Sequence, residues 1–236
     1  MVAVDPVREG PRRVGVLLGT GAPGASSADR REVPLLPLGA ELVLERLRSS
    51  LLSAGLDEAV VATSPQTPET SRYCQEHSIP WVAVPGEGYA ADVAKLATRF
   101  PRFLTVRADR PFLRPGTLAP FVKRAVSGVG VRLTGILPEA LFSWRQPRPP
   151  AWPHELPGLG RCGEAGIEAY DGEPSGPAEP FLFLDPWLAV RVQGDMDPRL
   201  LAEWARGCDR GDPAPGSSLE DGLSGPQSRK LGRATS

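Results

Sequence analysis

The sequence predicts an α/β fold in a single domain, with a doubly wound, mostly parallel sheet of Rossmann-like type. Two observations lead to this fold class. Short apolar runs of strand length alternate with helical patterns in the first half of the chain, and the connections between them are short. The 236 residues suit one domain of this kind followed by a tail.

The first strand is predicted at 14–18, and the small residues that follow it include Gly19, Gly21 and Gly24. Residues 40–54 carry leucine and valine at helical spacing, and Gly55 follows them as a stop. The same reading continues to residue 126. It predicts strands at 59–63, 81–84 and 103–106, and helices at 69–77, 89–99 and 115–126.

The second half of the chain is less regular. Strands are predicted at 131–137, 162–170 and 181–184, the last of them buried, with a short strand at 188–192 and a closing helix at 198–206. Residues 138–180 are rich in proline and glycine and contain Trp144 and Trp152, and a loop of such length is functional or disordered. We expect a flexible N-terminus (1–13), a domain (14–206) and a disordered tail (207–236).

Composition excludes several classes of function. The net charge of −1 leaves no global basic field for nucleic acid or an anionic membrane. No apolar run is long enough to span a bilayer, and the N-terminus lacks the apolar core of a signal peptide, so we expect a cytoplasmic protein. The cysteines, three in number and scattered, indicate neither a disulfide framework nor a zinc site.

Ligands in a doubly wound sheet bind at the carboxyl ends of the strands. A strand, a glycine-rich loop and a helix in this order let backbone N–H groups surround a phosphate chain. The alternative is an ordinary surface loop. The strand ends and the residues after them are therefore predicted to bind nucleotide, namely Leu18, Gly19, Thr20, Gly21, Thr63, Ser64, Gly86 and Gly88.

Acidic residues follow two predicted strands. Asp109 comes directly after the strand at 103–106, where a carboxylate suits a Mg²⁺ ion shared with phosphate oxygens; the alternative is a capping role. Glu168 is a second candidate ligand for the same cation. Asp185 is either another acidic site residue or the opening of a turn.

Arg30 and Arg31, at the end of the opening loop, are candidate catalytic cations. Positive charge over the β and γ phosphates favours the departure of pyrophosphate from a nucleotide. The alternative is that both arginines lie in a solvated loop.

The order of these segments resembles the MobA-like nucleotidyltransferases, and within them the archaeal-type GTP:adenosylcobinamide-phosphate guanylyltransferases. The segments that carry the likeness are ATSPQTP at 62–68, GEGYAAD at 86–92 and LAVRVQGDMDPRLLAE at 188–203. The likeness spans residues 14–206 and is weakest in the proline-rich middle.

The resemblance implies a fold of the nucleotide-diphospho-sugar transferase type. It further implies transfer of GMP from GTP to adenosylcobinamide phosphate or a similar phosphorylated acceptor, with Mg²⁺ as cofactor and release of pyrophosphate. Residue by residue, it assigns Gly19, Thr20 and Gly21 to the nucleotide loop, Asp109 to the metal-binding aspartate, and Tyr89 and Asp92 to nucleotide-binding positions.

The opening loop departs from this family. Relatives carry G-G-K-G-T-R-M there and Lys-Pro before the helix, whereas this chain reads GTGAPGASS at 19–27 and Val33-Pro34. The loss of one charge-assisted phosphate contact costs about a hundredfold in rate. Two alternatives therefore stay open: a guanylyltransferase for another acceptor, of molybdopterin or phospholactate type, and a catalytically silent nucleotide-binding protein. A homodimer through residues 181–192 is also open.

Overall fold

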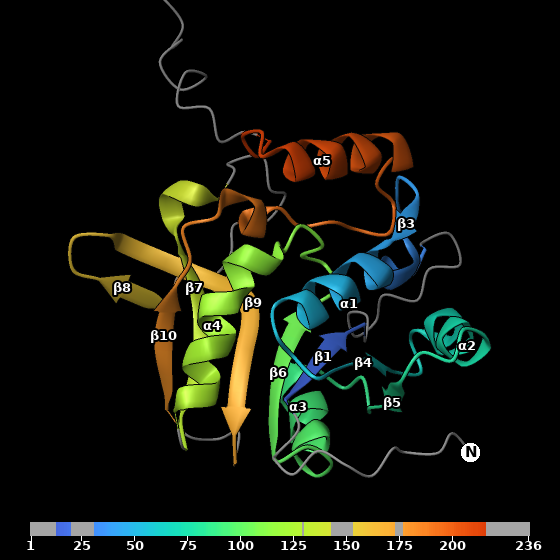
Figure 1. Cartoon of the computed structure of the whole chain (residues 1–236), viewed down its shortest axis with the longest axis horizontal. Coiled ribbons are helices and arrows are strands. Elements are labelled where there is room, and N and C mark those ends of the chain that lie inside the picture. Colours follow the sequence, from blue (N-terminus) through green and yellow to red (C-terminus); the bar gives the residue numbers. More distant parts are fainter. Residues whose placement is uncertain (1–12, 20–30, 129, 143–152, 173–176, 216–236) are drawn as a thin grey trace, which may run out of the picture.

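The computed structural model describes residues 13–19, 31–128, 130–142, 153–172 and 177–215 (Figure 1). The strands are β1 (Val14–Leu18), β2 (Pro37–Leu38), β3 (Glu41–Leu42), β4 (Glu58–Thr63), β5 (Trp81–Ala83), β6 (Arg102–Arg107), β7 (Arg132–Pro138), β8 (His154–Leu156), β9 (Gly160–Asp171) and β10 (Ala178–Leu182). The helices are α1 (Val43–Ser53), α2 (Pro68–Glu76), α3 (Tyr89–Ala97), α4 (Pro115–Ser127) and α5 (Pro198–Arg210), with short 3₁₀ turns η1 (Val33–Leu35), η2 (Glu139–Leu141) and η3 (Pro186–Ala189).

Within the described residues, eight strands form one sheet in the order β10-β7-β9-β6-β1-β4-β5, with β8 paired to β9. β1, β4, β5 and β6 are parallel to one another, and β7 is parallel to β10. β9 is antiparallel to β6 and β7, so its arrowhead in Figure 1 points opposite to that of β6. The predicted doubly wound, mostly parallel sheet is confirmed.

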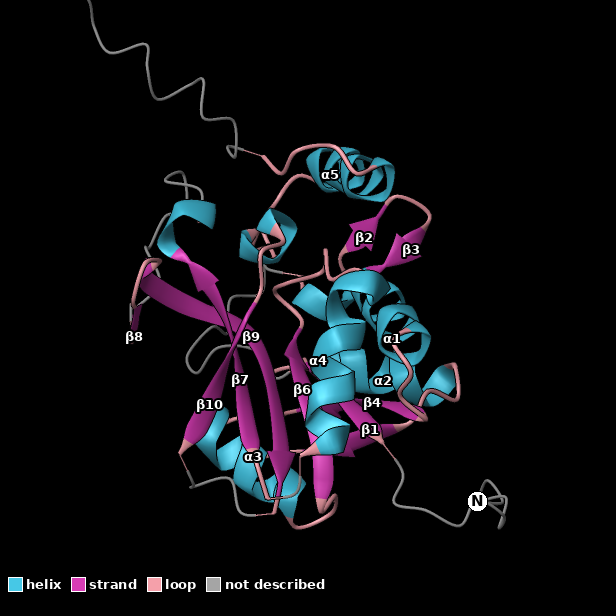
Figure 2. Ribbon diagram, turned by 60° about the vertical axis from the view of Figure 1, so that its left-hand side comes forward, coloured by secondary structure: helices cyan, strands magenta, loops and turns pink. Residues whose placement is uncertain are grey.

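The core lies on both faces of the sheet. Figure 2 shows α1 and α4 in front of the strands and α3 behind them. β1 is buried on both faces, because Leu17 packs with the helices in front whereas Val16 packs with α3. Leu47 of α1 is fully buried in the larger cluster. Its replacement by alanine therefore leaves a cavity, at a cost of about 2–5 kcal/mol.

The helix predicted at 40–54 is present as α1, but its start differs from the prediction. It begins at Val43, because β2 and β3 form a hairpin with Pro37 opposite Leu42. Gly39 makes its turn with a φ of 81°, a conformation that glycine adopts without strain. The Glu45 side chain then accepts the N–H of Leu42 at 2.8 Å and starts α1.

The second half differs more from expectation. The supposed long loop at 138–180 contains β9, which lies in the middle of the sheet and extends the strand predicted at 162–170. The buried strand predicted at 181–184 is replaced by the edge strand β10, and Leu184 is 67% exposed. The strand predicted at 188–192 is also wrong, since η3 occupies its start.

The closing helix α5 continues to Arg210, four residues beyond its predicted end and into the predicted tail. Its N-terminus is capped by Asp197, whose side chain accepts the N–H of Arg199 at 2.8 Å. Residues 1–12 and 216–236 lie outside the described residues, so the predicted tail and N-terminus stay predictions.

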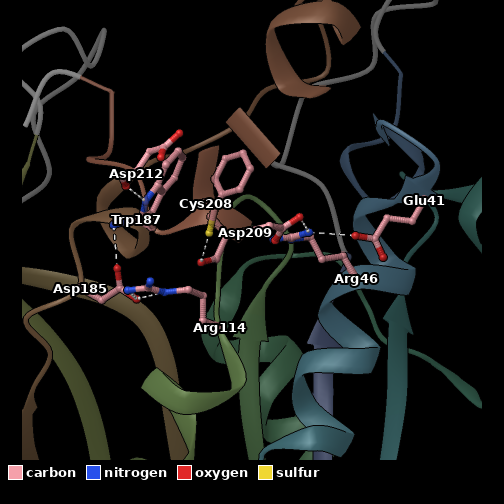
Figure 3. Close-up of polar contacts among 9 residues, drawn as sticks. Glu41, Arg46, Arg114, Asp185, Trp187, Cys208, Asp209 and Asp212 are labelled. Atoms are coloured by element: carbon pink, nitrogen blue, oxygen red, sulfur yellow. Dashed lines mark hydrogen bonds and ion pairs between the residues drawn. The ribbon is translucent and has the colours of Figure 1, made fainter. Parts of the chain in front are cut away.

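Polar contacts from distant parts of the chain hold α5 in place (Figure 3). Arg46 of α1 donates to Glu41 at 2.9 Å and to Asp209 of α5. The indole N–H of Trp187 donates to the carbonyl of Asp212 at 2.8 Å. These contacts join α5 to α1, and the residues that follow α5 to η3.

Asp185 opens η3. Its carboxylate accepts the N–H of Trp187 at 3.1 Å and pairs with Arg114 at 2.8 Å (Figure 3). It also accepts the hydroxyl of Thr117 at 2.6 Å. Asp185 was predicted to be either an acidic site residue or the opening of a turn, and these contacts match the turn.

All three cysteines are buried and free. None of the helices in the described ranges is long and apolar enough to cross a membrane.

Candidate active site

The parallel strands bring several predicted residues to one edge of the sheet. Register pairs Leu18 with Ala62 of β4 and with Arg107 of β6, so the carboxyl ends of β1, β4 and β6 are adjacent. The N–H of Gly19 donates to the carbonyl of Ala62 at 3.0 Å, and the N–H of Ala108 donates to that of Leu18 at 3.1 Å. This edge is the candidate active site.

Gly19 is required by close packing. A Cβ atom at this position would lie 2.8 Å from Cγ of Pro34 in η1. Glycine therefore lets the segment after the opening loop approach the end of β1. Thr20, Gly21 and Arg30, predicted for nucleotide binding or catalysis, lie outside the described residues.

Arg31 is described and exposed. Its backbone lies against Gly194, where a Cβ atom would come within 2.2 Å of the Arg31 carbonyl oxygen. The opening loop therefore starts beside β6, at Gly19, and ends beside the segment that follows η3.

Thr63 and Ser64 begin a compact turn after β4. The hydroxyl of Thr63 lies 3.2 Å from that of Ser71 in α2, so it faces the helix. The N–H of Ser64 donates to Oγ1 of Thr67 at 3.0 Å, and its hydroxyl donates to Oε1 of Gln66 at 2.6 Å. Both predicted residues therefore shape the backbone at this edge.

Glu32, which the sequence did not single out, caps the next helix. Its carboxylate accepts the backbone N–H groups of Glu69 and Thr70 at 2.9 and 2.7 Å. A carboxylate at a helix N-terminus satisfies free N–H groups and complements the helix dipole.

The loop between β5 and α3 packs against this turn. Gly86 has a φ of 72°, and a Cβ atom there would come within 2.7 Å of the Cβ atom of Ser64. Its N–H donates to Oδ1 of the buried Asp92 at 2.7 Å. Gly88 has a φ of 126° and its carbonyl accepts the N–H of Asp92 at 3.0 Å. Asp92 therefore closes the loop that the GEGYAAD motif forms.

Tyr89 points its hydroxyl toward the sheet. The oxygen lies 3.0 Å from the hydroxyl of Thr105 in β6 and 3.0 Å from that of Tyr170 in β9. Burial, followed by the negative charge of Glu168, raises the pKa of Tyr89 far above its ordinary value, so the phenol stays protonated. Tyr89 as a whole is 36% exposed.

Asp109 lies at the site edge, two residues after β6, and two arginines bind it. Arg107 donates Nε to Oδ1 at 3.2 Å and Nη2 to Oδ2 at 2.9 Å. Arg191 donates Nε and Nη2 to Oδ2 at 2.9 and 2.6 Å. Burial disfavours the charged form, but the charges of Arg107 and Arg191 outweigh it and hold the pKa of Asp109 below its ordinary value.

Glu168 lies on the face of the sheet that α3 covers, opposite Thr105 in the β6–β9 register. Its Oε2 atom accepts Nη2 of Arg132 at 2.8 Å and the hydroxyl of Tyr170 at 2.7 Å. Arg132 neutralises the charge of the buried carboxylate, and Tyr170 gives it a further hydrogen bond.

The contacts of the two predicted metal ligands do not fit a metal held by the protein alone. Within the described ranges, no group of three or more His, Cys, Asp or Glu side chains could hold a metal ion. Asp109 and Glu168 each accept hydrogen bonds from arginine. Their roles toward a cation stay predictions.

Sequence reasoning also missed Arg191, the second arginine on Asp109. Arg191 lies within the strand predicted at 188–192, and no local pattern marked it as a site residue, because its partner Asp109 is 82 residues away along the chain. The N–H of Val192 donates to the Asp109 carbonyl at 2.9 Å, which fixes the backbone of this segment beside the site.

Comparison with known families gives one match. A family model described as the MobA-like NTP transferase domain matches residues 22–144, just over half of the chain. The matched range contains Asp109, whereas Glu168 and Arg191 lie beyond it. A search of curated proteins finds no match.

Solved structures are similar in fold. A CMP:2-keto-3-deoxy-manno-octonic acid synthetase complexed with CTP aligns with a TM-score of 0.55 at 15% identity, covering 85% of this chain and 99% of its own. Rv0371c from Mycobacterium tuberculosis H37Rv aligns with a TM-score of 0.53 at 15% identity, covering 81% and 98%. A complex of Rv0371c with manganese has a TM-score of 0.46 at 12% identity, covering 72% and 88%.

Proposed function

Because the chain belongs to the MobA-like NTP transferase domain family, a family of nucleotidyltransferases, we propose that it transfers GMP from GTP to adenosylcobinamide phosphate. In this reaction a phosphate oxygen of the acceptor attacks the α-phosphorus of GTP in line. An oxygen–phosphorus bond forms, and the bond from the α-phosphorus to the bridging oxygen breaks, so pyrophosphate leaves with the electron pair. No covalent enzyme intermediate is needed.

The observation that carries the proposal is the loop between β5 and α3. Its GEGYAAD sequence supports the guanylyltransferase reading, and the hydrogen bond from Gly86 to Asp92 gives the loop a defined shape at the carboxyl edge of the sheet. Ligands of doubly wound sheets bind at this edge. The proposed nucleotide positions are those predicted from the sequence: Leu18, Gly19, Thr20, Gly21, Thr63, Ser64, Gly86, Gly88, Tyr89 and Asp92. Of these, Thr20 and Gly21 lie outside the described residues.

Magnesium enters the proposal as the ion that accompanies the triphosphate. Mg²⁺ keeps several water ligands and is commonly held through substrate phosphates with one or two carboxylates. Bound there, it would neutralise charge on the phosphates. Arg30 and Arg31 are the proposed catalytic cations of the opening loop.

Two alternatives have a basis in particular residues. A different phosphorylated acceptor, of molybdopterin or phospholactate type, would leave the nucleotide edge unchanged. A catalytically silent nucleotide-binding protein is favoured by the opening loop, which has no lysine or arginine before Arg30. A homodimer through residues 181–192 stays a proposal; Leu184 is the most exposed large apolar side chain of the described residues there.

Pyrophosphate release tests the function directly. Purified protein, Mg²⁺ and adenosylcobinamide phosphate are combined with GTP, ATP or CTP in parallel. CTP is included because the similar synthetase was solved with that nucleotide. We expect release with GTP alone. Release that requires another acceptor supports the first alternative, and GTP binding without release from any acceptor supports the silent protein.

Asp109→Ala tests the metal role. We expect activity to fall by about a hundredfold or more, since the proposed contact to the Mg²⁺ ion that accompanies the phosphates is lost. Activity that survives this change contradicts the assignment of Asp109 to the metal.

A further inference from the structure

We propose that Arg107 and Arg191, held together on Asp109, form a binding pair for the triphosphate chain of the nucleotide. The inference rests on the proposed nucleotidyl transfer and names the groups that supply positive charge to that site. It assigns to two arginines the charge that the opening loop lacks.

The first argument is the geometry of the pair. Arg107 binds both carboxylate oxygens of Asp109, and Arg191 binds Oδ2 through Nε and Nη2. Neither Nη1 group donates to an atom of the described residues. The two side chains remain 45% and 39% exposed, whereas Asp109 is 15% exposed. The carboxylate thus lies beneath two guanidinium groups that still offer N–H donors to solvent.

Both arginines are also fixed by packing. Arg107 lies over Gly166 of β9, where a Cβ atom would come within 3.1 Å of its Cδ. Gly166 has a φ of 72°, so glycine both adopts this backbone conformation without strain and leaves room for the Arg107 side chain. The segment of Arg191 is held by the hydrogen bond from Val192 to Asp109. A preorganised guanidinium loses less conformational entropy when it binds an anion.

The second argument is charge. Arg110 is buried beside the pair, donates to the carbonyls of Leu188 and Glu164 at 2.6 and 3.2 Å, and has an Nε with no partner among the described atoms. Burial lowers the pKa of Arg110 to about 10, which leaves it cationic at neutral pH. Three arginines therefore face the carboxylates of Asp109 and Glu164, and one positive charge is in excess.

The excess positive charge attracts an anion to the two guanidinium groups. Phosphate oxygens match the planar N–H geometry of arginine.

The third argument is location. Arg107 is paired with Leu18, the last residue of β1 before the opening loop. At the other end of that loop, Arg31 packs against Gly194, three residues after Arg191. The pair therefore lies between the two ends of the loop that is proposed to surround the phosphates.

The test uses inorganic tripolyphosphate as the probe and calorimetry as the readout, with EDTA present. The variants are Arg107→Gln and Arg191→Gln. The matched control is Arg124→Gln. Arg124 lies on α4, its side chain is 46% exposed, and it also pairs with one carboxylate, that of Glu179. We expect each variant at the pair to weaken binding about tenfold and the control to stay within about twofold of the wild type.

A second set of variants guards against misfolding. Arg107→Lys and Arg191→Lys keep the charge but lose the bidentate geometry, so we expect a smaller loss than with glutamine. Urea unfolding is measured for every variant. Folded glutamine variants that bind tripolyphosphate as the wild type does overturn the inference.

Binding of inorganic phosphate to the glutamine variants shows whether the pair binds the phosphates of the nucleotide or the phosphate of the acceptor. We expect its binding to change little, because a single phosphate lacks the contacts of the chain. Loss of phosphate binding with tripolyphosphate binding unchanged overturns the assignment to the nucleotide.

The result is separable from the proposed reaction. Tripolyphosphate binding through the pair, in a protein that transfers no GMP, supports the inference and contradicts the reaction. Normal pyrophosphate release by both glutamine variants, with unchanged KM for GTP, contradicts the inference alone.

Discussion

The carboxylate of Asp92 accepts the backbone N–H of Gly86 at 2.7 Å, and this contact joins the first turn of α3 to the loop that precedes it. Asp92 is 2% exposed, so the hydrogen bond is protected from water. The loop at the proposed nucleotide edge is thus held by the helix that follows it. Changes at Asp92 should act on nucleotide binding through the backbone of this loop.

Asp92→Ala removes the acceptor and leaves the Gly86 N–H without its partner. We expect the free energy of unfolding to fall by about 1–3 kcal/mol and the KM for GTP to rise. Asp92→Asn keeps an acceptor oxygen and serves as the control, with a smaller effect on both quantities. Urea denaturation and pyrophosphate release measure them. An alanine variant as stable as the wild type contradicts the structural role.

Glu168→Gln separates the predicted metal role from the ion pair with Arg132. The side chain of Glu168 is 9% exposed and accepts from Arg132 and Tyr170, so we expect a loss of about 1–3 kcal/mol in unfolding free energy. A metal contact of Glu168 predicts, in addition, about a tenfold rise in the Mg²⁺ concentration that gives half-maximal activity. An unchanged concentration would contradict the metal role and leave only the ion pair with Arg132.

The strands that the sequence predicted well are those whose burial is visible locally. β1, β4 and β6 agree with prediction within one residue at each end, because each is a run of apolar residues buried on both faces. The hairpin of β2 and β3 was missed, since the apolar residues around Gly39 continue the helical spacing of α1. Its turn depends on a positive φ that the pattern does not reveal.

β9 was underestimated for a different reason. Its sequence carries several glycines, and its register with β7 shifts between Thr134 and Ile136, near Gly166. Its pairing with β6 joins residues more than 60 positions apart, which no local pattern encodes. The same limit applies to the site. Asp109 was predicted as a site residue because it follows a strand, but its partner Arg191 could be recognised only once the chain had folded.

Tyr89→Phe tests which part of Tyr89 matters. The hydroxyl bonds Thr105 and Tyr170, so we expect its removal to lower the unfolding free energy by about 1 kcal/mol. The KM for GTP should stay within about twofold, because the hydroxyl faces the sheet and only the ring is exposed. Tyr89→Ala also removes the ring and should raise the KM. A large rise in KM for the phenylalanine variant contradicts this orientation.

The pair Arg102–Asp171 links the start of β6 to the end of β9, with two hydrogen bonds of 2.7 Å each. Burial of Asp171 favours its neutral form, but hydrogen bonds from Arg102 and from the N–H of Gly130 outweigh this and lower the pKa of Asp171. A carboxylate with a depressed folded pKa stabilises the protein above its unfolded pKa, about 3.9, and this contribution disappears as the pH falls through the folded value.

Asp171→Asn should therefore destabilise the protein by about 1–2 kcal/mol at pH 7, a value reduced for the partial exposure of Arg102. The difference from the wild type should persist at pH 5 and shrink below about pH 4, as the wild-type carboxylate takes up a proton. Urea unfolding across this range measures it. Glu179→Gln is the control, since its pair with Arg124 is exposed on both sides and should contribute little at any pH. A difference that does not depend on pH would show that the ion pair is not its source.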